Sequence, residues 1–186
     1  MSAARSASAA LRAARPYREV RSTFREGDLL AFRGRSAISA MIRAATGSVY
    51  SHVGLVYLIE ERRYCLEAVA KGVSLGLMSE VAKRYAGGID YFEIDAPDAV
   101  RHKATLFALE QLGKPFDFLG LLRFFIFLVL RIRARARIDR RWFCAELVAA
   151  AYRRQGFELA RTPSCYAAPK DLATSPLARR LYTVKP

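Results

Sequence analysis

Hydrophobic and polar positions follow a two-residue period through much of the first half of the chain, as is typical of β-strands. The clearest segment is His52–Ile59, H-V-G-L-V-Y-L-I, and Tyr64–Ala70 follows it after the charged sequence E-E-R-R. Two such segments separated by a short polar turn predict a β-hairpin. Further short strands are predicted at Gly27–Arg33, Val73–Leu77, Ile89–Ile94 and Leu181–Val184.

Longer apolar patterns predict helices, most of them in the second half of the chain. Glycine, a common residue after a helix end, follows three of them, at Gly47, Gly113 and Gly156. Asp98 is expected to cap the second helix. The predicted helices are Ala37–Thr46, Asp98–Leu112, Phe116–Leu130 and a helix from about Cys144 to Gln155. No repeat or linker divides the chain, and strands mostly precede helices, so we expect one α+β domain.

The apolar segment Phe116–Leu130 raises the question of a membrane. A spanning helix needs about 20 mostly apolar residues, and this segment is shorter and carries Asp117 and Arg123. Two interpretations stay open. The segment can be a helix buried in the core, or it can lie in a membrane interface, where the arginine-rich sequence that follows, R-I-R-A-R-A-R-I-D-R-R, would suit anionic headgroups.

Composition adds a strong positive charge to this pattern. Lys and Arg total 31 against 17 Asp and Glu, a formal net charge of +14, and 53% of the residues are hydrophobic. The charge favours anionic partners, among them a phospholipid surface. Nucleic acid is disfavoured, because no stacking aromatic residues alternate with the arginines and no helix-turn-helix or RNA-binding motif accompanies them.

The first residues differ in character from the rest of the chain. They are rich in Ala, Ser and Arg, contain no acidic residue before Glu19, and lack the apolar core of a secretory signal. We therefore expect residues 1–23 to form a disordered basic arm and residues 24–186 to form the folded domain; an organelle transit peptide is the weaker alternative.

The number and spacing of the cysteines bear on the cellular compartment and on metal binding. The three cysteines, Cys65, Cys144 and Cys165, are too few and too scattered for a disulfide framework or a zinc site. We expect no metal and no cofactor. Free thiols fit a reducing compartment, so the expected location is cytoplasmic, with peripheral association with a membrane as an option.

Cys144 is the first candidate for chemistry, because it stands where an apolar helix is predicted to begin. A thiol in the first turn lies beside unpaired backbone N–H groups, and the positive end of the helix dipole favours the nucleophilic thiolate. The alternative is that Cys144 is a buried packing residue, as cysteines often are. A partner base would decide in favour of catalysis.

Two histidines are available as that base. His102, in the polar sequence R-H-K, is expected to be a solvated surface residue, whereas His52 begins the strongest strand. With an even turn, Glu67 falls on the same side of the hairpin as His52. In that register Glu67 stands opposite Val56, about four residues and ~13 Å from His52, too far for a hydrogen bond without a tighter turn, a bulge or strong twist.

Five segments together resemble a known family. G-D-L-L-A-F, A-T-G-S-V-Y-S-H-V-G-L-V, L-E-A-V, L-G-K-P-F-D-F and F-C-A-E-L-V occur in the order found in the YiiX/YebB-like proteins, the circularly permuted branch of the papain-like NlpC superfamily. The resemblance runs from about Gly27 to the A-P-K-D-L tail. It implies a permuted papain-like fold, with a small antiparallel sheet packed against the cysteine helix.

The resemblance also implies the residues of a site. Cys144 would be the nucleophile, His52 the base and Glu67 the third polar member, and Tyr50 and Tyr166 would line the substrate cleft. The expected activity is hydrolysis of a peptide, peptidoglycan-type or lipid amide through an acyl-enzyme. Two alternatives stay open. One is a lipid-directed acyltransferase or thioesterase similar to lecithin:retinol acyltransferase, and the other is a non-catalytic membrane-surface binding protein.

Overall fold

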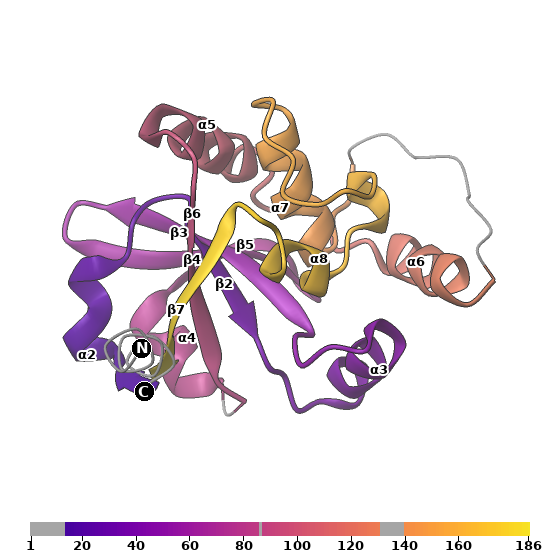
Figure 1. Cartoon of the computed structure of the whole chain (residues 1–186), viewed down its shortest axis with the longest axis horizontal. Coiled ribbons are helices and arrows are strands. Elements are labelled where there is room, and N and C mark those ends of the chain that lie inside the picture. Colours follow the sequence, from indigo (N-terminus) through magenta and orange to yellow (C-terminus); the bar gives the residue numbers. More distant parts are fainter. Residues whose placement is uncertain (1–13, 86, 131–139) are drawn as a thin grey trace, which may run out of the picture.

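The computed structural model describes residues 14–85, 87–130 and 140–186 and contains one seven-stranded sheet (Figure 1). The strand order is β1-β7-β6-β2-β3-β4-β5. Neighbouring strands are antiparallel except for β1 and β7, which are parallel. The strands are β1 (Ala14–Pro16), β2 (Leu29–Phe32), β3 (His52–Ile59), β4 (Arg62–Val69), β5 (Gly72–Leu77), β6 (Ile89–Ile94) and β7 (Ala178–Lys185).

Helices surround this sheet, and the predicted ones are present. Ser36 caps α3 by accepting a hydrogen bond from the Ser39 N–H, and Gly47 ends that helix in the left-handed conformation. The helices are α2 (Tyr17–Val20), α3 (Ala37–Thr46), α4 (Met78–Arg84), α5 (Asp98–Leu109), α6 (Phe118–Leu130), α7 (Cys144–Arg153) and α8 (Pro169–Ala173), with 3-10 turns η1 (Arg21–Thr23) and η2 (Ser164–Tyr166).

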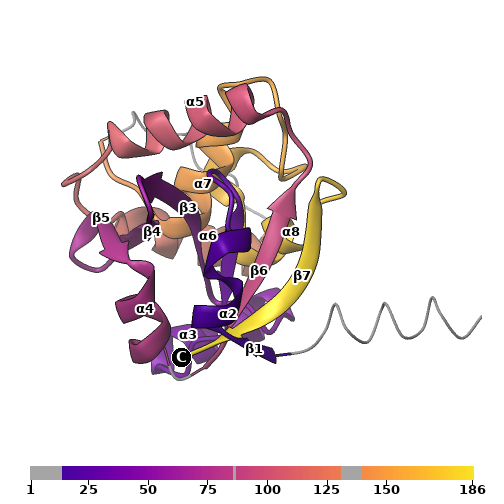
Figure 2. The same cartoon turned by 90° about the vertical axis from the view of Figure 1, so that its left-hand side faces the viewer.

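The sheet separates two hydrophobic cores, because successive side chains of a strand point to opposite faces. Val53 and Leu55 of β3 face a core shared with α5 and α7, while Val56 faces a second core shared with α4. In both views of the fold α5 and α7 lie above the sheet and α2 and α4 lie below it (Figures 1 and 2). The cysteine helix thus packs on the sheet, as predicted.

The N-terminal boundary predicted at residue 24 needs correction. Ala14–Pro16 forms β1, which pairs with β7 at the edge of the sheet, and Val20 is fully buried in the second core. The ordered fold therefore includes residues 14–23, and the prediction that they belong to the disordered basic arm is wrong. Residues 1–13 of that arm lie outside the described part of the chain.

The end of α5 and its start also differ from the prediction. Asp98 is the first residue of α5 rather than its cap, and its carboxylate pairs with Arg101 and Arg25. The helix ends at Leu109, and the chain turns through the following residues to Gly113, whose φ of 78° is left-handed. Within the described ranges, no helix has the length and hydrophobicity to cross a membrane.

Candidate active site

Cys144 is the first residue of α7, the position that the sequence predicted. Phe143 before it is extended, with φ −102° and ψ 164°, and no side chain caps the helix. The N–H groups of the first turn of a helix have no partner within that helix and carry its positive dipole end. The Cys144 side chain is therefore presented at a site that attracts negative charge.

The residues before Cys144 are held by the turn that precedes α6. Phe116 and Trp142 form a β-bridge, in which the Trp142 N–H donates to Pro115 (3.3 Å) and the Asp117 N–H donates to Trp142 (3.0 Å). The Trp142 indole also donates to Gln111 Oε1 at 3.3 Å. The sequence G-K-P-F-D-F thus holds the backbone of Trp142, two residues before Cys144, by hydrogen bonds. Trp142 also anchors this segment through its buried indole.

The hairpin of β3 and β4 brings His52 and Glu67 together. His52 Nε2 lies 2.5 Å from Glu67 Oε2, and both side chains are largely buried. The predicted parity is correct, but the register differs by two residues. Ile59 pairs with Arg62, so the turn is Glu60–Glu61. The register places Glu67 across from Gly54, one diagonal step from His52, instead of across from Val56.

Gly54 gives Glu67 the room for this diagonal contact. A Cβ atom at Gly54 would lie 2.8 Å from Cys65 Sγ and 3.2 Å from Glu67 Cβ, so a larger residue would push both side chains away. Cys65 is fully buried, and its thiol also hydrogen-bonds Glu67. No local sequence pattern indicated this second contact, which helps to hold the carboxyl group of Glu67 in place.

His52 also interacts with Cys144. Burial alone would lower the pKa of His52, but the negative charge of Cys144 and a hydrogen bond with it, together with Glu67, raise the pKa to about 10. Because Nε2 is bound to Glu67, Nδ1 is the ring nitrogen left for the thiol. The arrangement therefore favours a protonated imidazole held between the sulfur of Cys144 and the carboxyl group of Glu67.

The three side chains meet at the beginning of β3. His52 and Glu67 belong to the sheet face opposite α7, and Cys144 reaches them because it is the first residue of its helix. The Phe32 ring packs on the imidazole, with 5.0 Å between the ring centroids. Tyr85 lies nearby, and its hydroxyl shares a hydrogen bond with Ser51.

A cleft opens onto this group of side chains. It has a volume of about 700 Å³, within the range of ligand-binding pockets, and His52, Glu67 and Cys144 all line it. Most of the other lining residues are apolar, including Ile38, Phe118 and Leu121, while Lys71 and Arg84 supply positive charge. Burial raises the pKa of Tyr85, another lining residue, to about 12, so its hydroxyl stays protonated at neutral pH.

The structure does not bring Tyr50 and Tyr166 into this cleft lining. The Tyr50 hydroxyl instead donates to Asp90 at 2.7 Å, and its ring packs on Phe92. Tyr166 packs on Phe127 of α6, with 4.4 Å between ring centroids. Although Tyr50 is close to His52 in sequence, its side chain points to Asp90 and not into the cleft. The sequence also missed Tyr85 and Ser51, and the loop position of Tyr85 offered no signal.

The second histidine lies at the surface, as predicted. His102 on α5 is half exposed and contacts Glu26 at 3.2 Å. It has no contact with Cys144, so of the two histidines only His52 meets the thiol.

Comparisons with known proteins agree with this arrangement. The family described as permuted papain-like amidase enzyme, YaeF/YiiX, C92 family, matches residues 23–164. The fold is similar to the crystal structure of the metalloprotein yiiX from Escherichia coli O157:H7, with a TM-score of 0.69 and 18% identity over 88% of this chain and 99% of that one. No curated protein matches in a sequence search.

The word metalloprotein belongs to the Escherichia coli structure. In the part of this chain that the structure describes, no group of three His, Cys, Asp or Glu side chains is arranged to hold a metal ion. The family match covers most of the chain, and it includes the histidine strand, the glutamate strand and the cysteine helix in their permuted order. The chain therefore belongs to the permuted papain-like amidases of the YaeF/YiiX family and is a cysteine hydrolase.

Proposed function

We propose that the protein hydrolyses an amide bond with Cys144 as nucleophile, His52 as acid and base, and Glu67 as the group that orients His52. The observation that carries this proposal is the position of the imidazole, which contacts the thiol on one side and the carboxylate on the other at the wall of an open cleft. Nucleophile, base and orienting group in this order form the arrangement used for acyl transfer.

The reaction follows from the protonation states at the site. The Cys144 thiolate attacks the amide carbonyl carbon, and the C–N bond breaks as the His52 imidazolium gives its proton to the leaving amine. The acyl group is then held as a thioester on Cys144. Neutral His52 takes a proton from water, the resulting hydroxide attacks the thioester, and the carboxylic acid leaves as the thiolate–imidazolium pair is restored.

The start of α7 supplies the counter-charge for the tetrahedral intermediate. The Cys144 N–H is one of the first N–H groups of this helix, which have no intrahelical partner. A donor aimed at the developing oxyanion is worth about a hundred- to a thousandfold in rate. Glu67 acts on the imidazole, because its carboxylate holds Nε2–H and so keeps Nδ1 toward the sulfur.

The direct test replaces the sulfur. Cys144→Ala should lower hydrolysis of a panel of acyl and aminoacyl anilides by at least about a thousandfold and abolish labelling by an iodoacetamide probe. Cys165→Ala is the matched control, because Cys165 is a free thiol outside the lining of the cleft. It should retain both labelling and turnover. Hydrolysis that survives in Cys144→Ala would remove the thiol from the mechanism.

A second candidate function is transfer of the acyl group to an acceptor other than water. The apolar lining of the cleft favours it, because an apolar wall suits a lipid acyl chain and restricts water. Product analysis distinguishes the two functions. Hydrolysis yields a free carboxylic acid, while transfer in the presence of an added amine or alcohol yields the new amide or ester.

A further inference from the structure

Exposed hydrophobic side chains gather on α3 and α6. Of the eleven large hydrophobic residues that are exposed in the described part of the chain, two lie on α3 and five on α6. They form what we call the apolar rim: Ile38, Met41, Phe118, Leu119, Leu122, Ile126 and Leu130, each 39% to 60% exposed. The two helices lie side by side at one end of the molecule (Figure 1), so their exposed residues form one surface.

Helix α6 has distinct inner and outer faces although nearly all its residues are apolar. At 3.6 residues per turn, its exposed residues fall within an arc of about 120°, and Arg123 borders that arc. The inner face packs on the domain, where Phe124 contacts Phe143 and Phe127 contacts Tyr166. The core interpretation of the segment therefore holds for one face of α6, while the other face is exposed.

Helix α3 presents a similar surface. Its outward residues are four alanines with Ile38 and Met41, and none of them is charged. Arg43, the one charged residue of the helix, is only partly exposed and donates to the Gly34 carbonyl. A helix that faced only water would carry polar residues on this side. Exposed apolar surface that extends over two helices marks an interaction site.

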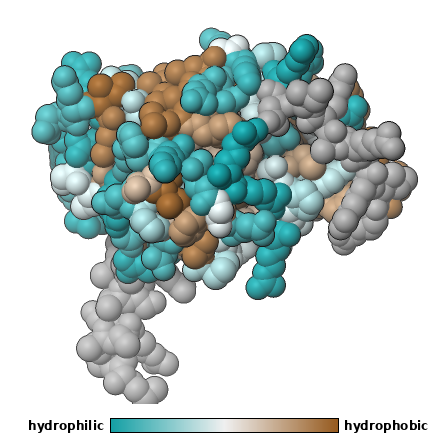
Figure 3. Space-filling view, turned by 90° about the horizontal axis from the view of Figure 1, so that it is seen from above, coloured by the Kyte–Doolittle hydropathy of each residue, from teal (hydrophilic) through white to brown (hydrophobic). Residues whose placement is uncertain are grey.

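The apolar rim continues directly into the cleft. Ile38 and Phe118 belong to both, since they are exposed at the surface and line the cavity that contains Cys144. Figure 3 shows hydrophobic side chains beside the grey atoms at the right-hand end, where α6 lies in Figure 1. The apolar rim and the cleft that contains Cys144 thus share two apolar residues, and most of the cleft lining is apolar.

The charges around the apolar rim indicate what covers it. Arg35 precedes α3, Lys170 donates to the Thr46 carbonyl at the end of α3, and Arg123 borders the exposed arc of α6. Lys71 and Arg84 are exposed where the cleft opens. Apolar side chains ringed by basic ones match the interface of an anionic bilayer.

We propose that the apolar rim docks the protein on an anionic phospholipid surface, and that a long-chain acyl amide passes from the bilayer into the cleft. The second half rests on the proposed function, since Cys144 would then take the acyl group as a thioester while the amine leaves. Docking turns the open end of the cleft toward the acyl chains, which gives an apolar substrate a route that avoids water.

Vesicle binding tests the docking separately from catalysis. The full chain carrying Cys144→Ala would be mixed with vesicles of phosphatidylcholine alone, and of phosphatidylcholine with roughly one third phosphatidylglycerol. We expect binding to the anionic vesicles that is weakened but not abolished between about 0.1 M and about 1 M salt. Complete loss of binding in high salt would contradict apolar insertion and overturn the proposal, as would equal binding to both vesicles.

Matched double variants locate the surface. Leu119→Gln with Leu122→Gln alters the apolar rim, and Leu106→Gln with Leu112→Gln alters two similarly exposed leucines on and just after α5. The rim variant should bind anionic vesicles about tenfold or more weakly, and the α5 variant should bind as the parent does. Equal loss in both variants would overturn the proposal. Thermal unfolding of both variants checks that the exposed substitutions leave the fold intact.

Sedimentation and turnover separate the remaining outcomes. If the parent is a dimer that does not bind vesicles, and the rim substitutions make it monomeric, the apolar rim is an interface with a second copy and the docking proposal is overturned.

The wild-type chain is then given palmitoyl p-nitroanilide in anionic vesicles and acetyl p-nitroanilide in solution. Turnover of the palmitoyl amide that depends on docking supports the substrate class. Docking without turnover of either amide would support docking on the membrane and contradict the proposed function.

Discussion

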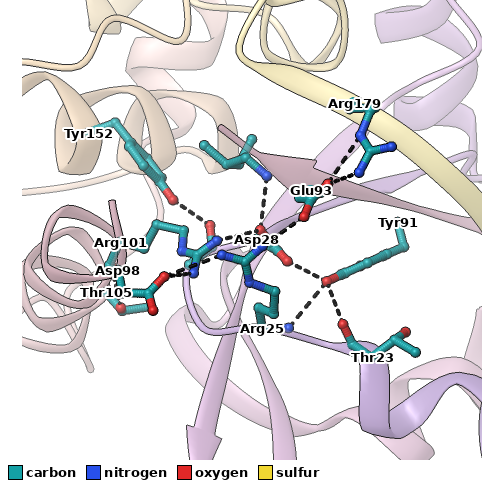
Figure 4. A network of polar contacts seen from close by, with 12 residues as sticks. Thr23, Arg25, Asp28, Tyr91, Glu93, Asp98, Arg101, Thr105, Tyr152 and Arg179 are labelled. Carbon is teal, nitrogen blue, oxygen red and sulfur yellow. Dashed lines mark hydrogen bonds and ion pairs between the residues drawn. The ribbon is translucent and has the colours of Figure 1, made fainter. Parts of the chain in front are cut away.

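Helix α7 carries a buried polar cluster at each end, and the two clusters differ in what surrounds them. Its first residue, Cys144, meets His52 at an open cleft. Near its last turn, Tyr152 donates to the Gly27 carbonyl at 2.6 Å and joins a closed network (Figure 4). One end of this helix therefore lies at the proposed active site, and the other end belongs to a buried structural network.

The closed network is centred on Asp28. Its carboxylate accepts hydrogen bonds from the Tyr91 hydroxyl and from the Ile94 N–H (2.9 Å) and lies 3.8 Å from Arg101. Asp28 and Tyr91 are fully buried, and Arg101 is 3% exposed. These buried groups join the residue before β2 to β6 and α5, and they have no access to a substrate.

Groups at both ends of α7 have shifted pKa values, so a shifted pKa does not by itself identify the active site. Burial raises the pKa of Asp28 despite its hydrogen bonds, and the pKa of His52 is raised to about 10. What distinguishes the cleft is that the proposed nucleophile, Cys144, and the proposed base, His52, line it together with open space for a substrate. A structural ion-pair network perturbs pKa values as strongly as an active site does.

The largest expected effect is at the open end. His52→Ala should lower kcat/KM by at least about a thousandfold, because the thiol loses its base and the leaving amine loses its proton donor. The free energy of unfolding should change far less than the free energy of activation does. His102→Ala is the control, since it removes the exposed histidine on α5, and it should keep kcat/KM within about twofold. Comparable losses in the two variants would contradict the assignment of the base.

The closed end should respond in the opposite way. Asp28→Ala removes the buried one of the two carboxylates that pair with Arg101, and with it the acceptor of two hydrogen bonds, so we expect a loss of about 3–5 kcal/mol in the free energy of unfolding. Urea denaturation measures this loss, and active-site titration measures turnover per folded molecule, which should be unchanged. A stable variant with slow turnover would show that the network acts on catalysis.

The pH profile sharpens the role of His52. Because its pKa is raised to about 10, the ring keeps its proton up to that pH and loses it above. Amide hydrolysis needs this proton, so kcat/KM should fall about tenfold per pH unit above about 10. Alkylation of Cys144 by iodoacetamide needs no proton donor and should not fall there. A parallel fall in both rates would indicate unfolding, which circular dichroism at the same pH would reveal.

The smallest effect is expected for Tyr152→Phe. The substitution removes only the hydroxyl that donates to the Gly27 carbonyl, and it should cost about 1 kcal/mol in the free energy of unfolding. Thermal unfolding of the variant gives this value. A loss as large as that of Asp28→Ala would mean that the network depends on Tyr152 as much as on its carboxylate.

Local patterns predicted the elements better than the contacts between them. The strand His52–Ile59 and the helix Ala37–Thr46 have the predicted bounds, because apolar alternation and a terminal glycine are written in neighbouring residues. The hairpin shows the limit. Parity placed Glu67 on the correct face, but the position of the turn at Glu60–Glu61, which decides the spacing to His52, depends on pairing along the whole hairpin.

Side-chain directions and long-range pairing could not be predicted in the same way. Tyr50 lies two residues before His52, yet its hydroxyl binds Asp90, which belongs to a strand distant in sequence. The strand Ala14–Pro16 has no apolar alternation and is defined only by its pairing with β7 near the other end of the chain. Such contacts depend on the assembled sheet, so the sequence carries no local sign of them.

The β-bridge between Phe116 and Trp142 has a consequence for how this enzyme could diversify. The chain continues from one side of that bridge into α6, and the other side of the bridge lies directly before Cys144. The segment between them is anchored at its base, so the register of the nucleophile is set without reference to its length. An engineer could therefore vary the exposed face of α6 to retarget the hydrolase, while its buried face and the bridge keep Cys144 in place.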